Sequence, residues 1–124
     1  MSQPAAAVAT ADRLYQGQPA TTEATLYTAP GYASGSPYAA GATALAKRLI
    51  VCNTTASAAT LTLYLVPSGG SASAANELFN ALSVAAGTTT ILDLEQSMNP
   101  GDFIAGLQSV AAALTVSLSG VTFQ

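Results

Sequence analysis

The sequence predicts an all-β protein, an antiparallel β-sandwich or jelly roll with at most one short helix near residues 74–81. Six or more short segments rich in Leu, Ile, Val, Thr and Tyr alternate in residue type, and turns of Gly, Pro and Asn separate them. Helical patterns do not alternate with these segments, which argues against parallel βαβ units. An OB-type barrel is the weaker alternative.

The strongest strand signals lie between Ala44 and Pro67, where two alternating segments are joined by a polar connection at residues 53–57. This pattern predicts a β-hairpin. Leu61, Leu63 and Leu65 share one face of the second strand, which we expect to be a core face. The first strand has apolar residues on both faces, as in the middle of a sheet. Its faces are predicted to carry Leu45, Leu49 and Val51 on one side and Ile50 and Cys52 on the other.

Elements on either side of this hairpin follow from composition. Residues 24–29 predict a strand that ends at Pro30, and residues 30–43 are a long loop rich in Gly, Pro and Tyr. After a Gly/Ser turn, Ser73 could cap a short helix in which Leu78 and Leu82 share a face.

Three further strands are predicted towards the end of the sequence. Residues 88–94 alternate, and a turn at residues 99–102 separates them from a strand over 103–108. In the last segment, 114–123, the apolar residues change parity at Gly120, which predicts a β-bulge there.

The first 23 residues are mainly Ala, Thr, Gln and Pro around one apolar pair, Leu14 and Tyr15. Such a segment buries little surface, so we expect a flexible N-terminal arm over residues 1–23 that orders against a neighbour, followed by a single β-sandwich domain over 24–124. Neither a secretory signal nor an apolar stretch long enough to cross a membrane is expected, which predicts a soluble protein.

Charge is scarce and limits the possible partners. Charged residues make up 7% of the 124 residues, the net charge is −3, and the only cations are Arg13, Lys47 and Arg48. A protein that binds nucleic acid needs a basic surface to neutralise phosphates. We therefore expect neither nucleic acid nor a membrane as a partner.

The sequence also excludes most catalytic chemistry. It contains no His, which excludes His-dependent triads and most zinc sites, and its single cysteine, Cys52, is expected to be a small buried residue. Asp93, Glu95 and Asp102 could form an acid pair like that of glycosidases, or bind a hard cation with nearby carbonyls. These acids match no specific motif, so we predict no catalytic, metal or cofactor site.

The residues predicted to contact a partner are Leu14, Tyr15, Tyr32, Tyr38, Lys47 and Arg48. Tyr combines apolar area with a polar tip and is enriched at interfaces, although Tyr32 and Tyr38 could equally pack onto the sandwich. Adjacent residues on a strand point to opposite faces, so one of Lys47 and Arg48 would face inwards or towards a partner, unless its stem is merely solvated.

Four runs resemble small virion structural proteins of tailed bacteriophages: TLYTAP (25–30), RLIVCNTTASAATLTLYLVPSGG (48–70), LSVAAGTTTILDL (82–94) and NPGDFI (99–104). The resemblance is a pattern of strands and turns without a catalytic signature. It implies an antiparallel β-sandwich in the virion, first of all a capsid cement or decoration protein, and otherwise a neck, tail or fibre component.

We therefore predict a non-enzymatic virion protein that stabilises a phage capsid through contacts with capsid or other virion proteins, and that forms a homo-oligomer, a dimer or a trimer. A carbohydrate-binding host-adhesion module is the alternative from another class, using Tyr32, Tyr38 and Tyr64. An enzyme based on carboxylates alone would need Asp93 and Glu95 to face a cleft.

Overall fold

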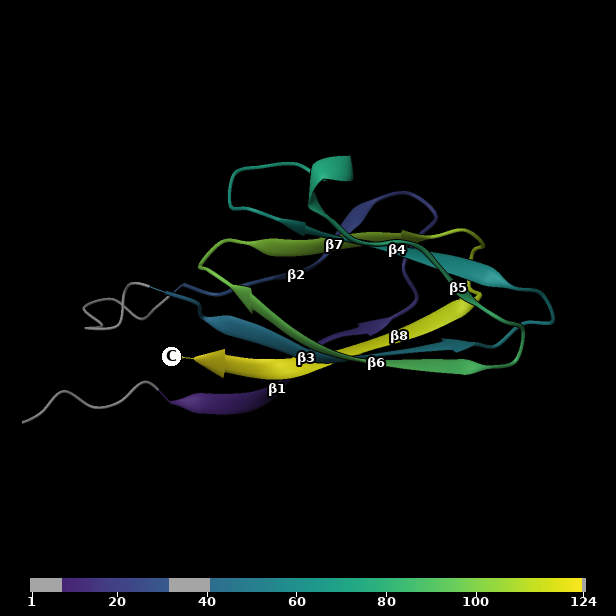
Figure 1. Cartoon of the computed structure of the whole chain (residues 1–124), viewed down its shortest axis with the longest axis horizontal. Coiled ribbons are helices and arrows are strands. Elements are labelled where there is room, and N and C mark those ends of the chain that lie inside the picture. The colour runs from purple at the N-terminus through teal and green to yellow at the C-terminus, as the bar shows by residue number, and fades with distance from the viewer. Residues whose placement is uncertain (1–7, 32–40, 124) are drawn as a thin grey trace, which may run out of the picture.

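A computed structural model describes residues 8–31 and 41–123 as two four-stranded antiparallel sheets packed face to face (Figure 1). Sheet A has the strand order β1-β8-β3-β6, and sheet B has the order β2-β7-β4-β5. The elements are β1 (Ala9–Gly17), β2 (Ala24–Thr28), β3 (Ala44–Asn53), β4 (Ala59–Val66), the 3₁₀ turn η1 (Ala74–Asn76), β5 (Glu77–Val84), β6 (Thr89–Met98), β7 (Phe103–Gln108) and β8 (Leu114–Phe123).

This strand order is that of a jelly roll. Strand β1 pairs with β8, β2 with β7, β3 with β6 and β4 with β5, as if one long hairpin were rolled up into two layers. Every connection except the one between β4 and β5 therefore crosses from one sheet to the other. The predicted antiparallel sandwich or jelly roll is confirmed.

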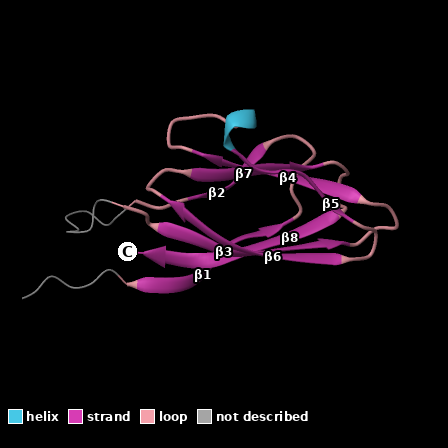
Figure 2. Ribbon diagram, viewed as in Figure 1, coloured by secondary structure: helices cyan, strands magenta, loops and turns pink. Residues whose placement is uncertain are grey.

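The core fills the space between the two sheets. Inward-facing side chains of both layers form one apolar cluster, because side chains alternate between the two faces of each strand. Its largest fully buried apolar members are Leu49, Val51, Leu61, Leu63, Val84, Met98, Ile104, Leu114 and Val116. In the part of the chain that the structure describes, η1 is the only helical element, and it lies on the outer side of sheet B (Figure 2). No helix among these residues is long and apolar enough to cross a membrane.

Strands β3 and β4 have the predicted positions, and β3 lies in mid-sheet as expected, but the predicted β-hairpin is wrong. Strand β3 pairs with β6 and β8 in sheet A, whereas β4 pairs with β5 and β7 in sheet B. Residues 54–58 therefore pass from one layer to the other. Alternation and a polar turn are common to both arrangements, so the local pattern cannot distinguish a hairpin from a crossing.

A single buried side chain, Asn53, organises this crossing. Its Nδ2 group donates to the carbonyl oxygens of Ser57 and Val84, each at 2.9 Å. Its Oδ1 accepts from the backbone N–H of Thr55 at 2.9 Å and from the Thr55 hydroxyl at 2.8 Å. Asn53 is 1% exposed, and its hydrogen bond to Val84, which joins the crossing to the end of β5, is buried away from water.

The predicted flexible arm is wrong for residues 9–17, which form β1 along β8. Leu14 supplies the apolar contact, because its side chain is 6% exposed within the core. The following residues are held by Gln108, whose backbone N–H donates to the carbonyl of Ala20 at 3.0 Å and whose side-chain amide donates to that of Pro19. Residues 1–7 lie outside the described residues.

The predicted helix near residues 74–81 is confirmed only for its first turn, η1. Residues 77–84 form β5 instead and pair with β4. Leu78 and Leu82 suggested a helix because they are four apart, but an even spacing also keeps two residues on one face of a strand. The spacing of Leu78 and Leu82 is therefore compatible with a helix and with a strand, and the segment forms a strand because it pairs with β4.

The predicted bulge at Gly120 is also wrong. Burial alternates without a break along β8, with Gly120 and Thr122 facing inwards and Val121 and Phe123 facing outwards. The irregularities lie in the neighbouring strands, at Leu14 in β1 and at Lys47 in β3. The extra residue at position 47 reverses the alternation in β3, so Leu45 faces away from Leu49 and Val51, contrary to the prediction.

The remaining elements agree with the sequence. Strands β2 and β7 lie as predicted, and β6 continues beyond residue 94 to Met98. At the predicted turn over 99–102, Gly101 has φ +85° and the N–H of Asp102 donates to the carbonyl of Asn99 at 3.0 Å. The Asp102 carboxylate accepts the backbone N–H groups of Ser68 and Asn99, each at 3.0 Å, so this acid has a structural role.

Candidate interaction surface

The outer face of sheet A carries a band of charged side chains across its strands. Ser119 of β8 faces outwards between the inward-facing Leu118 and Gly120, and residues opposite one another in neighbouring strands share a face. Arg13, Ser119, Arg48 and Asp93 are such neighbours, running from β1 through β8 and β3 to β6. We define the charged stripe as Arg13, Lys47, Arg48, Asp93 and Glu95, which includes all three cations of the chain and two of its six acids.

Lys47 and Arg48 both lie on this outer side, although adjacent strand residues were predicted to point to opposite faces. The bulge at position 47 explains the difference, because an extra residue re-aims the side chains around it. The Nζ of Lys47 lies 3.5 Å from Glu95 Oε1, and the Nε of Arg48 lies 2.9 Å from Asp93 Oδ1. Their side chains are 47% and 54% exposed, so these pairs contribute little to stability.

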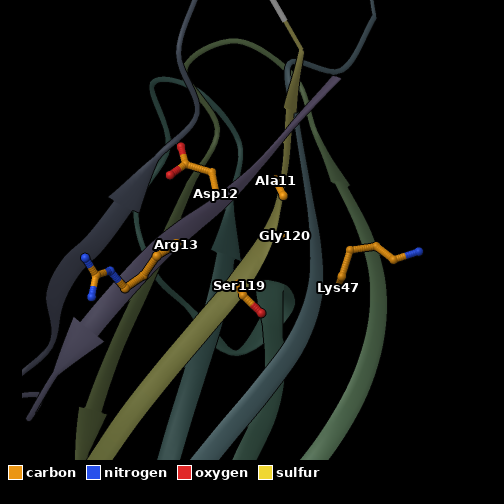
Figure 3. Close-up of a pocket in the computed structure, with 6 residues that line it drawn as sticks. All are labelled: Ala11, Asp12, Arg13, Lys47, Ser119 and Gly120. Carbon is orange, nitrogen blue, oxygen red and sulfur yellow. The ribbon is translucent and has the colours of Figure 1, made fainter. Parts of the chain in front are cut away.

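An open hollow lies in the stripe over Gly120 of β8. It is lined by Ala11, Asp12, Arg13, Lys47, Ser119 and Gly120. Figure 3 shows Arg13 and Lys47 pointing away from each other on either side of β8. Because the two cations diverge, the hollow does not offer a convergent site for a small anion.

Apolar residues flank the stripe on the same outer face. The first apolar patch consists of Ala9, Ala11, Leu45, Val121 and Phe123, and the second of Ile50, Cys52 and Ile91. Ile91 is 57% exposed and Cys52 is partly exposed, so the prediction that Cys52 is buried is wrong. The face thus changes along the strands from apolar to charged and back to apolar.

The predicted contact residues have different surroundings. Leu14 belongs to the core, so its side chain is not free to contact a partner while β1 stays paired, and Tyr15 is half-buried against that core. Tyr32 and Tyr38 lie outside the described residues. Lys47 and Arg48 are exposed in the stripe. Arg13, which the sequence did not single out, joins them only through the pairing of β1 with β8.

Asp93 and Glu95, the acids that could form a catalytic pair, line an open hollow on the outer face of sheet A together with Lys47 and Arg48. Asp93 and Glu95 point the same way, as the strand period predicts, but they lie on an open sheet face and each pairs with a separate cation. Among the described residues, no group of three or more His, Cys, Asp or Glu side chains could hold a metal ion. Tyr64, a candidate for sugar binding, is half-buried in β4.

Two tyrosines beside the core make stability depend on alkaline pH. Burial raises the pKa of Tyr15 above its ordinary value of 10.0. The pKa of Tyr27 is also raised, mainly by burial and to a smaller extent by the negative charge of Asp12. Above pH 10 the unfolded chain loses these protons before the folded one does, so stability is complete below pH 10 and falls as the pH rises further. We expect the urea midpoint to decrease above pH 10. The decrease should be shallower in a Tyr15→Phe/Tyr27→Phe variant, and an unchanged slope would contradict this account.

No family model and no curated protein matches the sequence. Among solved structures, the chain is similar to one from a "Structure of infectious bursal disease virus Gx strain", with a TM-score of 0.51 and 13% identity over 94% of this chain and 32% of that chain. A chain of the Gt strain covers 96% of this chain and 29% of its own length, with a TM-score of 0.42 and 13% identity. The chain thus spans about a third of the length of these neighbours. At this identity the likeness to the Gx chain concerns the fold alone.

Proposed function

We propose that this chain is a non-enzymatic structural protein of a virus particle, a capsid cement or decoration protein of a tailed phage that stabilises the shell through contacts between subunits. The observation that carries the proposal is the open outer face of sheet A, where apolar patches flank a charged stripe. Such an extended mixed surface suits another protein, whereas small molecules are bound in concave pockets with convergent polar groups.

Two further observations support a role in a virion. The jelly-roll fold is similar to part of a chain from a virus structure, at the level of fold. The resemblance of the strand and turn sequences to small virion proteins of tailed phages also supports a role in a virion, and it indicates that the particle is a tailed phage. Asp93 and Glu95 line an open hollow together with Lys47 and Arg48, and each acid forms an ion pair with a different cation, which favours a structural protein over an enzyme.

The proposal is tested on particles of the phage that encodes this chain, prepared with and without it. We expect the protein at regular positions on the shell in difference images, and we expect particles without it to release their genome at a lower temperature. Adding the purified protein should restore the higher temperature, because a domain that binds only the assembled shell stabilises that state by mass action.

A Glu23→Arg variant tests whether any charge reversal would impair binding, because Glu23 is exposed and precedes β2, away from the outer face of sheet A. It should restore the particles as well as the unmodified protein does. If difference images place the protein at the neck, tail or fibre instead of the shell, it is a component of that structure and not a cement protein. Specific hits on a glycan array, or absence from the particle, would overturn the proposal.

A further inference from the structure

We propose that two copies of this chain pack face to face through the outer faces of their A sheets, about a two-fold axis parallel to the strands. The inference rests on the proposed role in assembly for its biological meaning. The interface itself is a property of the free protein and can be tested without particles.

The composition of this face favours a second protein layer. Half-buried apolar side chains lie at both ends of the face, and Ile91 is 57% exposed. In a sandwich, such side chains are normally covered by another sheet about 10 Å away. A second copy supplies a sheet with the same dimensions.

The order of charges selects the axis. From β1 to β6 the stripe is positive at Arg13, uncharged at Ser119, positive at Arg48 and negative at Asp93. A two-fold axis parallel to the strands reverses the strand order of the second copy and keeps the level along the strands. Strand β1 then lies over β6 of the second copy, so Arg13 faces Asp93 in two equivalent pairs. At the level of the first apolar patch Val121 faces Leu45 of the second copy, whereas Ile50 and Ile91 of the second patch face Ser117 and Gln16.

The other in-plane axis, parallel to the stripe, is unfavourable. It places each strand over the same strand of the second copy, so Arg13 would face Arg13 and Asp93 would face Asp93. Like charges directly opposite each other are destabilising. The sequence of charges across the sheet therefore distinguishes two arrangements that would bury the same area.

Arg13 is the stripe cation that is available for such a pair. Its guanidinium donates to the side-chain oxygen of Gln16 at 2.6 Å, a neutral partner in the same strand. Over residues 8–31 and 41–123, the salt bridges within 4.0 Å involve Lys47 and Arg48 but not Arg13. Asp93 accepts a hydrogen bond from Arg48, and a carboxylate has further lone pairs for a second cation.

The size of the face predicts a weak dimer. Four strands spaced about 4.8 Å apart and roughly eight residues long give an area on the order of 500 Å² per copy. This is below the roughly 800 Å² per partner of a standard interface. We expect a monomer–dimer equilibrium with a Kd on the order of tens of micromolar, a strength that repeated contacts in a lattice would reinforce.

The test uses sedimentation equilibrium with charge reversals on each side of the proposed pair. Arg13→Glu and Asp93→Arg should each raise the Kd of self-association by at least about tenfold, because both pairs of the dimer then carry like charges. In a 1:1 mixture of the two variants, one pair is reversed and the other is native, so both pairs are attractive. The mixture should therefore dimerise with a Kd within a few fold of the unmodified protein.

Matched measurements separate this result from misfolding. Glu23→Arg makes the same charge change as Asp93→Arg away from sheet A and should leave the Kd unchanged. Each variant should retain the circular dichroism and urea midpoint of the unmodified protein. An unmodified protein that stays monomeric up to millimolar concentrations, or a mixture no better than either variant alone, would overturn the interface. If the mixture dimerises while the protein is absent from particles, the interface stands and the proposed function fails.

Discussion

Replacing Gly120 by alanine is expected to destabilise the protein by at least about 3 kcal/mol, a large part of the 5–15 kcal/mol that holds a typical domain folded. A Cβ at this position would lie 2.0 Å from the carbonyl oxygen of Leu45 and 3.1 Å from the Cα of Ala46. These are backbone atoms of β3, which is hydrogen-bonded to β8 on one side and to β6 on the other. The strand cannot move away without breaking a ladder, so the clash must separate β8 from β3.

Two other glycines give a graded control for this substitution. At Gly106 a Cβ would lie 2.6 Å from Leu63 Cδ2, the end of a side chain, and 3.0 Å from the carbonyl oxygen of Thr62, so Gly106→Ala should cost less than Gly120→Ala. At Gly31 no atom lies within 4 Å, and Gly31→Ala should be close to neutral. Urea unfolding of the three variants provides the measurement. A Gly120→Ala protein as stable as Gly31→Ala would show that β8 and β3 are not packed as described.

Replacing Asn53 by alanine is expected to cost about 2–4 kcal/mol. The substitution removes four hydrogen bonds at a site that is 1% exposed. It leaves the carbonyl of Val84 and the N–H of Thr55 without the Asn53 side chain as partner, whereas the Ser57 carbonyl still accepts from the Thr55 hydroxyl. The loss concerns the crossing between β3 and β4, so we expect faster hydrogen exchange of the amides around residues 54–58 as well as a lower urea midpoint.

Asn53→Asp tests the same contacts through pH. The new carboxylate would face two carbonyl oxygens in a buried site, so its pKa in the folded protein should rise above the value of about 3.9 expected in the unfolded chain. A raised folded pKa means that the variant is closest to the unmodified protein below that pH and loses stability as the pH rises towards neutrality. Asn80→Asp, at an exposed position of β5, should show little of this dependence. A pH-independent difference for Asn53→Asp would contradict the hydrogen-bond pattern.

Part of the candidate surface could be predicted from the sequence, and part could not. Lys47 and Arg48 were identified as contact candidates because adjacent strand residues were expected to point to opposite faces, although the bulge at position 47 places both on the outer face. Asp93 and Glu95 were placed on one face by the strand period. Arg13 was overlooked because it lies in a polar segment with little strand signal, and that segment becomes β1 only by pairing with β8. Leu14 was assigned to a partner because its burial also depends on that pairing.

The sequence alone determined the fold class, the positions of most strands, the mid-sheet place of β3 and the exclusion of His-dependent chemistry. These properties are local, since alternation, turn residues and composition can be recognised without knowing which strands meet. Tertiary structure decided the rest: that β3 and β4 lie in different sheets, that residues 77–84 are a strand, that the bulges fall at Leu14 and Lys47 rather than Gly120, and that five charges from three strands form one stripe. Each of these depends on contacts between residues far apart in the chain. One extra residue in a strand is enough to change the face on which every later side chain lies.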